Sequence, residues 1–66
     1  MNHLSPLLDI AKIEARNRVQ ESHLAVVQIF GRLQAAPLGQ RLTFAVQLRH
    51  AAQGLVDALV EWEMIA

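Results

Sequence analysis

Residues 44–65 read FAVQLRHAAQGLVDALVEWEMI, and large or small apolar residues recur through this stretch at alternating spacings of four and three. Such a heptad repeat places one stripe of side chains along one side of a helix, where it packs against a second helix. Small residues alternate with large ones, which favours close approach of the two backbones. The stripe, which we expect to form the core or the dimer contact, consists of Phe44, Leu48, Ala51, Leu55, Ala58, Trp62 and Ile65.

A second row widens this stripe into a face that one partner helix would not cover. The chain has 66 residues and no cysteine, so it is short for independent stability and has no disulfide to support it. Hydrophobic residues make up 53% of it and charged residues only 18%. We therefore predict a homodimer, since twofold dimers are the commonest symmetric assembly. The second row consists of Ala45, Ala52, Leu59 and Ala66.

The remaining sequence predicts one further helix and a single turn. Ser5-Pro6 is typical of a helix start, because serine caps the first amides and proline suits the first turn. Pro37 cannot continue a helix. We predict an all-α fold in one domain over residues 1–66: a helix over 6–34, a turn over 35–39 and a helix over 40–65, forming an antiparallel hairpin that dimerises into a four-helix bundle. Gly54 lies inside the second helix, which indicates a close helix crossing.

The first helix carries a less regular stripe that is interrupted by Lys12 and Ser22. Its middle, residues 16–23, is a polar waist in which Val19 is the only apolar residue. Antiparallel pairing around the turn predicts ion pairs between Lys12 and Glu61 and between Arg16 and Asp57, each contributing about 0–1 kcal/mol. The stripe of the first helix consists of Leu8, Lys12, Ala15, Val19, Ser22, Val26, Ile29 and Leu33.

A second apolar stripe of the first helix, Ile10, Ile13, Leu24 and Val27, has no place in the hairpin contact. The dimer either buries it or leaves it for a partner, because exposed apolar patches with polar neighbours mark binding surfaces. The candidate partner-binding residues are Ile13, Arg16, Asn17, Arg18, Gln20 and Leu24. We expect replacement of both arginines by glutamate to abolish target binding and to leave helicity intact.

Six basic and six acidic residues give the chain a net charge of zero, so it has no general positive field for nucleic acid. Arginines flank the turn, whereas acidic residues gather toward the two ends of the chain. The longest uncharged run, residues 22–31, is too short to span a membrane. The start of the chain does not resemble a signal peptide, so we expect a cytoplasmic protein that does not bind membranes.

The residue pattern does not predict an enzyme, a cofactor or a metal site. Glu61 and Glu63 point to different sides of a helix, and no glycine-rich phosphate loop is present. His23 and His50 are expected at one level of the hairpin, where two imidazoles would bind a metal only with a further ligand. No such ligand is aligned with them.

Two stretches resemble a known family. The chain begins Leu4-Ser5-Pro6-Leu7-Leu8-Asp9, and the second helix contains Ala45, Leu48, Ala51-Ala52, Leu55 and Asp57-Ala58-Leu59. This order is similar to that of the small anti-quorum-sensing proteins of Pseudomonas temperate phages. The resemblance implies a dimeric helical hairpin that inhibits a LuxR-type regulator and the ATPase of type IV pilus assembly. Residues 10–40 lie outside the resemblance.

We therefore expect a phage-encoded protein-binding inhibitor that acts in the cytoplasm of a bacterial host and occludes a surface of a host regulator or motor protein. Three alternatives stay open. One is a co-chaperone of type III secretion, which would be recovered as an obligate heterodimer. Another is an RNA-binding hairpin dimer that controls plasmid copy number, which would need a basic ridge. The last is a purely structural assembly module.

Overall fold

The computed structural model of the chain describes residues 5–65, apart from the side chains of Ser5, Pro6 and Leu8. The expected cap by the Ser5 hydroxyl and the stripe positions of Leu8 and Ala66 therefore lie outside what is described. The elements are helix α1 (Ser5–Ala35), a short 3-10 helix η1 (Leu38–Gln40) and helix α2 (Arg41–Ile65).

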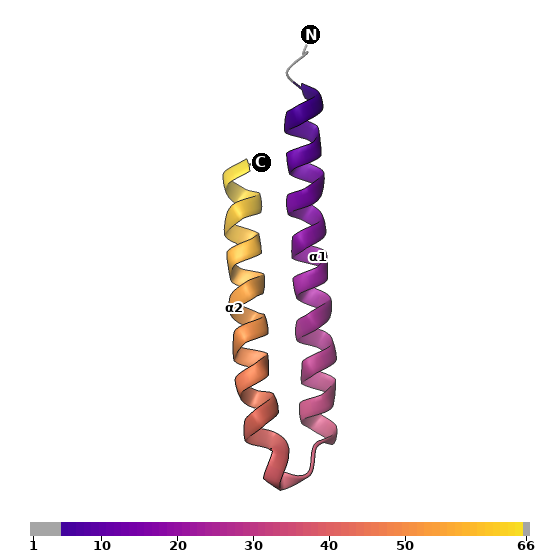
Figure 1. Ribbon diagram of the computed structural model, residues 1–66, viewed down its shortest axis with the longest axis vertical. Coiled ribbons are helices and arrows are strands. Elements are labelled where there is room, and N and C mark those ends of the chain that lie inside the picture. Colours follow the sequence, from indigo (N-terminus) through magenta and orange to yellow (C-terminus); the bar gives the residue numbers. More distant parts are fainter. Residues whose placement is uncertain (1–4, 66) are drawn as a thin grey trace.

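The two long helices run antiparallel and pack against each other along their length (Figure 1). The prediction of an all-α fold with two packed helices is thus confirmed for the described part of the chain, which contains no strand. The helix bounds lie within one residue of those expected from the sequence. Neither helix has a segment long and apolar enough to cross a bilayer, within residues 5–65.

The turn between the helices is built by backbone bonds around Pro37. The amide of Ala36 donates to the Leu33 carbonyl at 3.3 Å, which ends α1 with a tighter turn. Pro37 has an extended backbone with φ −61° and ψ 157°, and its carbonyl accepts from the Gln40 amide at 2.9 Å. The Arg41 side chain donates from Nε to the Ala36 carbonyl at 3.4 Å. This η1 turn displaces the start of α2 and so sets the register of the hairpin.

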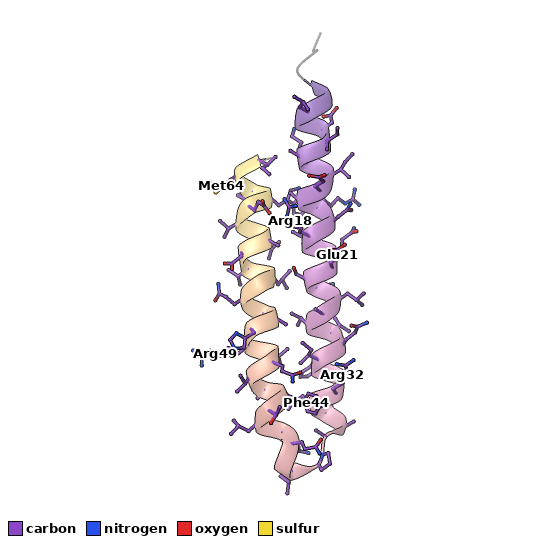
Figure 2. All side chains as sticks on the ribbon, in the orientation of Figure 1. Arg18, Glu21, Arg32, Phe44, Arg49 and Met64 are labelled. Atoms are coloured by element: carbon purple, nitrogen blue, oxygen red, sulfur yellow. The ribbon has the colours of Figure 1, made fainter. Side chains whose placement is uncertain are left out.

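The heptad stripe of α2 faces α1. All seven of its residues are buried or half-buried, and the only other residue of α2 that is not exposed is Glu61. Arg49 and Met64, which lie off the stripe, point away from α1 (Figure 2). The facing residues of α1, which with the seven of α2 we call the seam, are Ala11, Ala15, Val19, Ser22, Ala25, Val26, Ile29 and Leu33.

The prediction that Lys12 belongs to the seam of α1 is wrong. Lys12 is exposed, and its neighbour Ala11 is half-buried in its place. A change of one position turns a side chain by about 100° around a helix, so the two residues lie on different sides. The charge therefore stays in water, and the helices meet through an alanine at this level.

The contact between the helices has no large fully buried side chain within the described residues. The buried residues are Ala15, Ala36 and Ala58. Ala36 lies in the turn, and the small side chains of Ala15 and Ala58 let the helices approach. The Cα radius of gyration is 16.0 Å, compared with about 11 Å for a compact domain of this length. The hairpin is a thin rod with two sides of each helix open to solvent.

The expected ion pairs Lys12–Glu61 and Arg16–Asp57 are absent, so the predicted register is wrong. Within residues 5–65 the structure contains one ion pair, between Arg18 and Glu61. The connection has the expected five residues but lies one residue later in the chain, over 36–40, which moves α2 toward the turn end relative to α1. As a result α2 ends short of the start of α1, whose first turns have no helix beside them (Figure 1).

Candidate functional site

The seam divides the surface of the hairpin into distinct sides. On α1, Arg18 and Glu21 each directly precede a seam residue. On α2, Gly54, Asp57 and Glu61 do the same. Because the helices are antiparallel, residues that precede the seam on both helices lie on the same side of the hairpin. We call this side the groove face.

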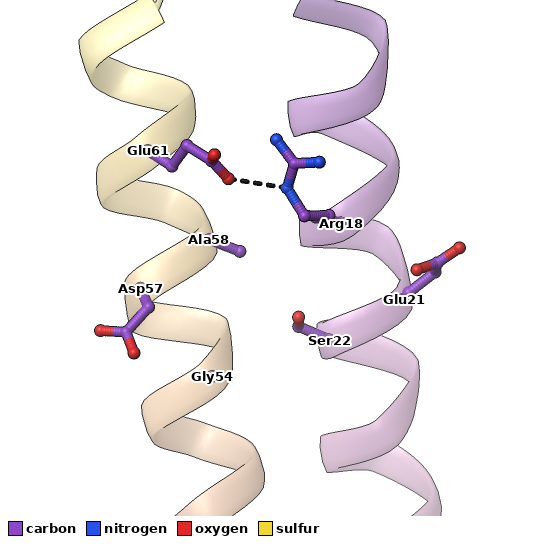
Figure 3. Close-up of a pocket in the computed structure, with 7 residues that line it drawn as sticks. All are labelled: Arg18, Glu21, Ser22, Gly54, Asp57, Ala58 and Glu61. Atoms are coloured by element: carbon purple, nitrogen blue, oxygen red, sulfur yellow. Dashed lines mark hydrogen bonds and ion pairs between the residues drawn. The ribbon is translucent and has the colours of Figure 1, made fainter. Parts of the chain in front are cut away.

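A shallow open groove of about 390 Å³ runs between the helices on this face. Figure 3 shows Arg18 level with Ala58, and Ser22 between the levels of Asp57 and Gly54. These levels give the register directly, with residue 18 opposite residue 58. The groove is lined by Arg18, Glu21, Ser22, Gly54, Asp57, Ala58 and Glu61.

Charge dominates the groove face. The Arg18 Nε donates to Glu61 Oε1 at 2.7 Å, and this hydrogen bond raises the pKa of Arg18 above its ordinary value, while loss of hydration opposes the change. The charges of Glu61, Glu14 and Glu21 act in the same direction as the hydrogen bond. Asp57 accepts from Gln53 Nε2 at 3.0 Å, and its carboxylate points away from α1 at the edge of the groove (Figure 3). The acidic side chains of the groove outnumber its single arginine.

The prediction of a close helix crossing at Gly54 is wrong. A Cβ built on Gly54 meets no atom within 4 Å apart from its own helix and chain neighbours. The absent side chain widens the groove. The two helices approach each other closely at alanines of the seam, such as Ala58, and need no glycine there.

The two histidines lie on opposite sides of the hairpin. His50 directly precedes a seam residue and belongs to the groove face, whereas His23 directly follows Ser22 and lies on the other side. Both are exposed. In the described part of the chain, no three or more histidine, cysteine or acidic side chains are grouped so as to hold a metal ion.

The six candidate partner-binding residues separate into two groups. Ile13, Asn17, Gln20 and Leu24 lie on the side of α1 that points away from α2, and Arg16 lies at the border of that side. All of these are exposed. Arg18 does not join them, because it lies on the groove face and is bound to Glu61.

The exposed group belongs to a complete heptad stripe on the back of α1, which we call the outer stripe. Its spacing alternates three and four, with two apolar residues at each end and two amides in the middle. The four apolar side chains are each more than half exposed. The outer stripe consists of Ile10, Ile13, Asn17, Gln20, Leu24 and Val27.

Comparison of the chain with protein-family models, with curated proteins and with solved structures finds no significant match.

Sequence reasoning missed a similar stripe on the back of α2. It has apolar residues at both ends and a polar middle formed by Arg49 and Gln53. Its apolar members are exposed. With Arg49 and Gln53 included, the stripe alternates spacings of four and three as far as Val60, and this period would have identified it beside the stronger seam pattern. The apolar members are Leu42, Val46, Val56, Val60 and Met64.

Proposed function

We propose that the chain is a small protein-binding inhibitor that acts as a homodimer and occludes a surface of a bacterial host protein. The observation that carries this proposal is the distribution of apolar side chains. Thirteen large apolar residues of the described part are exposed, whereas no large side chain is fully buried. Soluble monomers rarely leave such stripes uncovered, and contiguous exposed stripes mark protein contacts.

The outer stripe is the proposed target-binding surface. It lies opposite the seam, so it stays accessible when the hairpin forms. Side chains at heptad positions on one helix face are the pattern by which a helix docks into a groove of another protein, and the outer stripe fills these positions with two apolar pairs separated by two amides. Here Ile13 and Leu24 flank Asn17 and Gln20, so apolar contacts would supply affinity and the two amides would select hydrogen-bonding partners.

Inhibition would follow from occlusion. A helix bound in a groove of the target prevents the target's own helix, DNA or motor partner from reaching that groove. The resemblance to phage anti-quorum-sensing proteins suggests a phage-encoded inhibitor acting in the host cytoplasm on a transcriptional regulator or a motor ATPase. Binding of this kind requires neither a cofactor nor catalytic chemistry.

The test is recovery of a target by the tagged chain from bacterial lysate, followed by mass spectrometry. The informative variant is Ile13→Gln with Leu24→Gln, and its matched control on α2 is Val56→Gln with Val60→Gln. The four residues have similar exposed fractions, 58%, 54%, 50% and 53%. The two pairs therefore match in fractional exposure, and the valine pair removes a somewhat smaller apolar area because each valine has one carbon fewer.

We expect the wild type and the α2 variant to recover the same regulator or ATPase and the α1 variant to lose it. Equal recovery by all three proteins would show that the outer stripe is not the binding surface. If the chain is instead recovered as an obligate heterodimer with one small secretion-system protein, the proposed inhibitor function is wrong and the co-chaperone function replaces it. Arg18→Glu, which changes the groove face, is expected to leave target binding unchanged.

A further inference from the structure

The surface area of the hairpin indicates how much of it a partner must cover. The chain exposes 5179 Å², whereas a compact monomer of 7.4 kDa exposes about 4200 Å². The excess of roughly 1000 Å² is close to the ~800 Å² that each partner buries in a stable complex. A second copy of the chain burying one face would remove this excess.

One side of the hairpin is suited to this role. Residues that directly follow the seam lie opposite the groove face, and on α2 they include Ala45, Ala52 and Leu59. This side adjoins the seam, so a second hairpin placed there would extend the contact between α1 and α2 into one core. We call it the Ala52 face, and it comprises Arg16, His23 and Phe30 of α1 with Arg41, Ala45, Ala52, Leu59 and Glu63 of α2, all exposed.

The groove face is a poor surface for a twofold contact. It carries Glu21, Asp57 and Glu61 with one arginine, which is already bound within the chain. Two copies meeting there would bring like charges together and remove them from water, which costs free energy without compensation.

The α2 part of the Ala52 face is arranged symmetrically about Ala52. Ala45 and Leu59 lie seven residues to either side, and Arg41 and Glu63 lie eleven to either side. Each such pair is complementary: a small side chain corresponds to a large one, and a basic side chain corresponds to an acidic one. A twofold axis at Ala52, perpendicular to the helix, would bring the members of each pair together from different copies.

The α1 part has the same property about His23. Arg16 and Phe30 lie seven residues to either side, and an arginine against an aromatic ring is a favourable contact. The two centres also lie near one level of the hairpin. Ser22 lies between the levels of Asp57 and Gly54 (Figure 3), so His23, one residue nearer the turn, lies within one helical turn of the level of Ala52.

We propose that two copies of the chain pack through the Ala52 face in antiparallel orientation, about a twofold axis perpendicular to the helices at the level of His23 and Ala52. This inference rests on the homodimer of the proposed function and adds its face and orientation. Ala52 contacts the partner's Ala52 at the axis, and Leu59 packs over the partner's Ala45. Arg41, whose Nε donates to the Ala36 carbonyl, pairs through its remaining guanidinium N–H groups with the partner's Glu63 at both ends.

Charge favours this arrangement over a parallel one. Arg32, Arg41 and Arg49 all lie toward the turn, whereas the open half of the hairpin carries all six acidic residues against Lys12, Arg16 and Arg18. A parallel dimer would gather six arginines at one end and leave the acidic groups at the other. The antiparallel dimer places each basic end beside an acidic end. It also leaves most of the outer stripe of both copies uncovered, because Ile13, Asn17 and Leu24 lie on a different side of α1. Gln20 and Val27, which directly follow seam residues, border the Ala52 face.

The test uses single cysteines, because the chain has none of its own. Ala52→Cys places one thiol of each copy at the proposed axis, where two alanines let the backbones approach to disulfide distance. Gln53→Cys is the matched control, at the same level but on the back of α2. We expect oxidation to convert most of the Ala52→Cys protein into a disulfide-linked dimer and to leave the Gln53→Cys protein unlinked.

A second pair of variants tests orientation without depending on the axis. Ala45→Cys and Leu59→Cys should each link poorly alone and link efficiently when the two proteins are mixed, unfolded and refolded together. Linking of Ala52→Cys to His23→Cys in a mixture, without self-linking of Ala52→Cys, would show a parallel dimer and overturn the inference. Circular dichroism of each variant checks that it remains helical.

Sedimentation equilibrium separates this inference from the proposed function. If the wild type is a dimer but the Ala52→Cys protein does not self-link, only the proposed face and orientation are overturned. A chain that stays monomeric at every concentration overturns both this inference and the homodimer of the proposed function. Loss of target capture by the outer-stripe variant is measured independently of either result.

Discussion

Arg18 and Glu61, which are 43 positions apart in the chain, are joined by a hydrogen-bonded ion pair of 2.7 Å between Nε and Oε1. Both side chains are 45% exposed. The pair bridges α1 and α2 across the groove, at the level where the polar waist of α1 begins. It reports the register of the hairpin, because a shift of α2 by one turn would separate the two groups.

Glu61→Gln is expected to lower the melting midpoint by only about 1–5 °C at constant protein concentration, because exposed ion pairs are screened by water. The control is Glu21→Gln, because Glu21 lines the same groove but does not bond to Arg18, and it should change the melting midpoint less. Thermal melts followed by circular dichroism measure both. A large loss that persists at high salt would show that Glu61 has a role beyond this ion pair.

The pH dependence of this pair follows from the raised pKa of Arg18. A base whose folded pKa is raised contributes stability that is present below its ordinary pKa and is lost only above it. Because arginine is ordinarily charged far above neutrality, the difference in midpoint between wild type and Arg18→Met should be equal at about pH 7 and about pH 10. A difference that disappears at the higher pH would contradict this account.

Gly54→Ala is expected to stabilise the protein by about 0.5–1 kcal/mol. Alanine has a lower entropic cost than glycine inside a helix, and the added methyl group meets open space. Gly31→Ala, on the back of α1, also meets open space and should give a similar gain. Chemical denaturation at one protein concentration measures both. If Gly54→Ala is destabilised while Gly31→Ala is stabilised, another group must lie close to Gly54 on the groove face.

Ala58→Leu is expected to destabilise the hairpin by about 1–3 kcal/mol, because Ala58 is buried where the helices approach and a larger side chain forces them apart. Ala35→Leu, at an exposed position near the end of α1, is the control and should be nearly neutral. The measurement is denaturant unfolding followed by far-ultraviolet circular dichroism. If Ala58→Leu has the same free energy of unfolding as the wild type, the helices can move apart at Ala58 without a loss of stability.

Exchange of the Arg41 and Glu63 charges tests the ends of the proposed dimer. Arg41→Glu and Glu63→Arg each place like charges at both ends of an antiparallel dimer, so each is expected to weaken self-association by about 2–10-fold at low salt. A one-to-one mixture of the two variants restores opposite charges in every mixed dimer. Fluorescence energy transfer between labelled chains should therefore show preferential mixed dimers, whereas a statistical mixture would contradict the pairing.

The fold was predictable because Phe44, Leu48 and Leu55 repeat the heptad without interruption, and this period permits one helix face only. The register of the two helices was not predictable in the same way, because it depends on how the chain turns at Pro37. The turn lies one residue later in the chain than the sequence pattern indicated, and Glu61 meets Arg18 and not Lys12.

The candidate site was predictable in part. Ile13 and Leu24 share a side of α1 because their spacing follows the helix period, and they are exposed as a partner surface requires. Arg18 was grouped with them by its nearness in sequence to Asn17, although one step along a helix turns a side chain by about 100°. The prediction of a close helix crossing at Gly54 was wrong for another reason. Glycine is compatible with a close contact and with an open groove, and only the surrounding structure decides between them.

The scarcity of buried side chains has a consequence for gene dosage. Only Ala15, Ala36 and Ala58 are buried among the described residues. If the chain dimerises as proposed, folding and self-association would be one equilibrium, and the folded fraction would rise with the number of copies in the cell. At low expression most chains would be unfolded and open to proteolysis. The protein would then act as a threshold device, silent while its gene is weakly transcribed and active soon after transcription becomes strong.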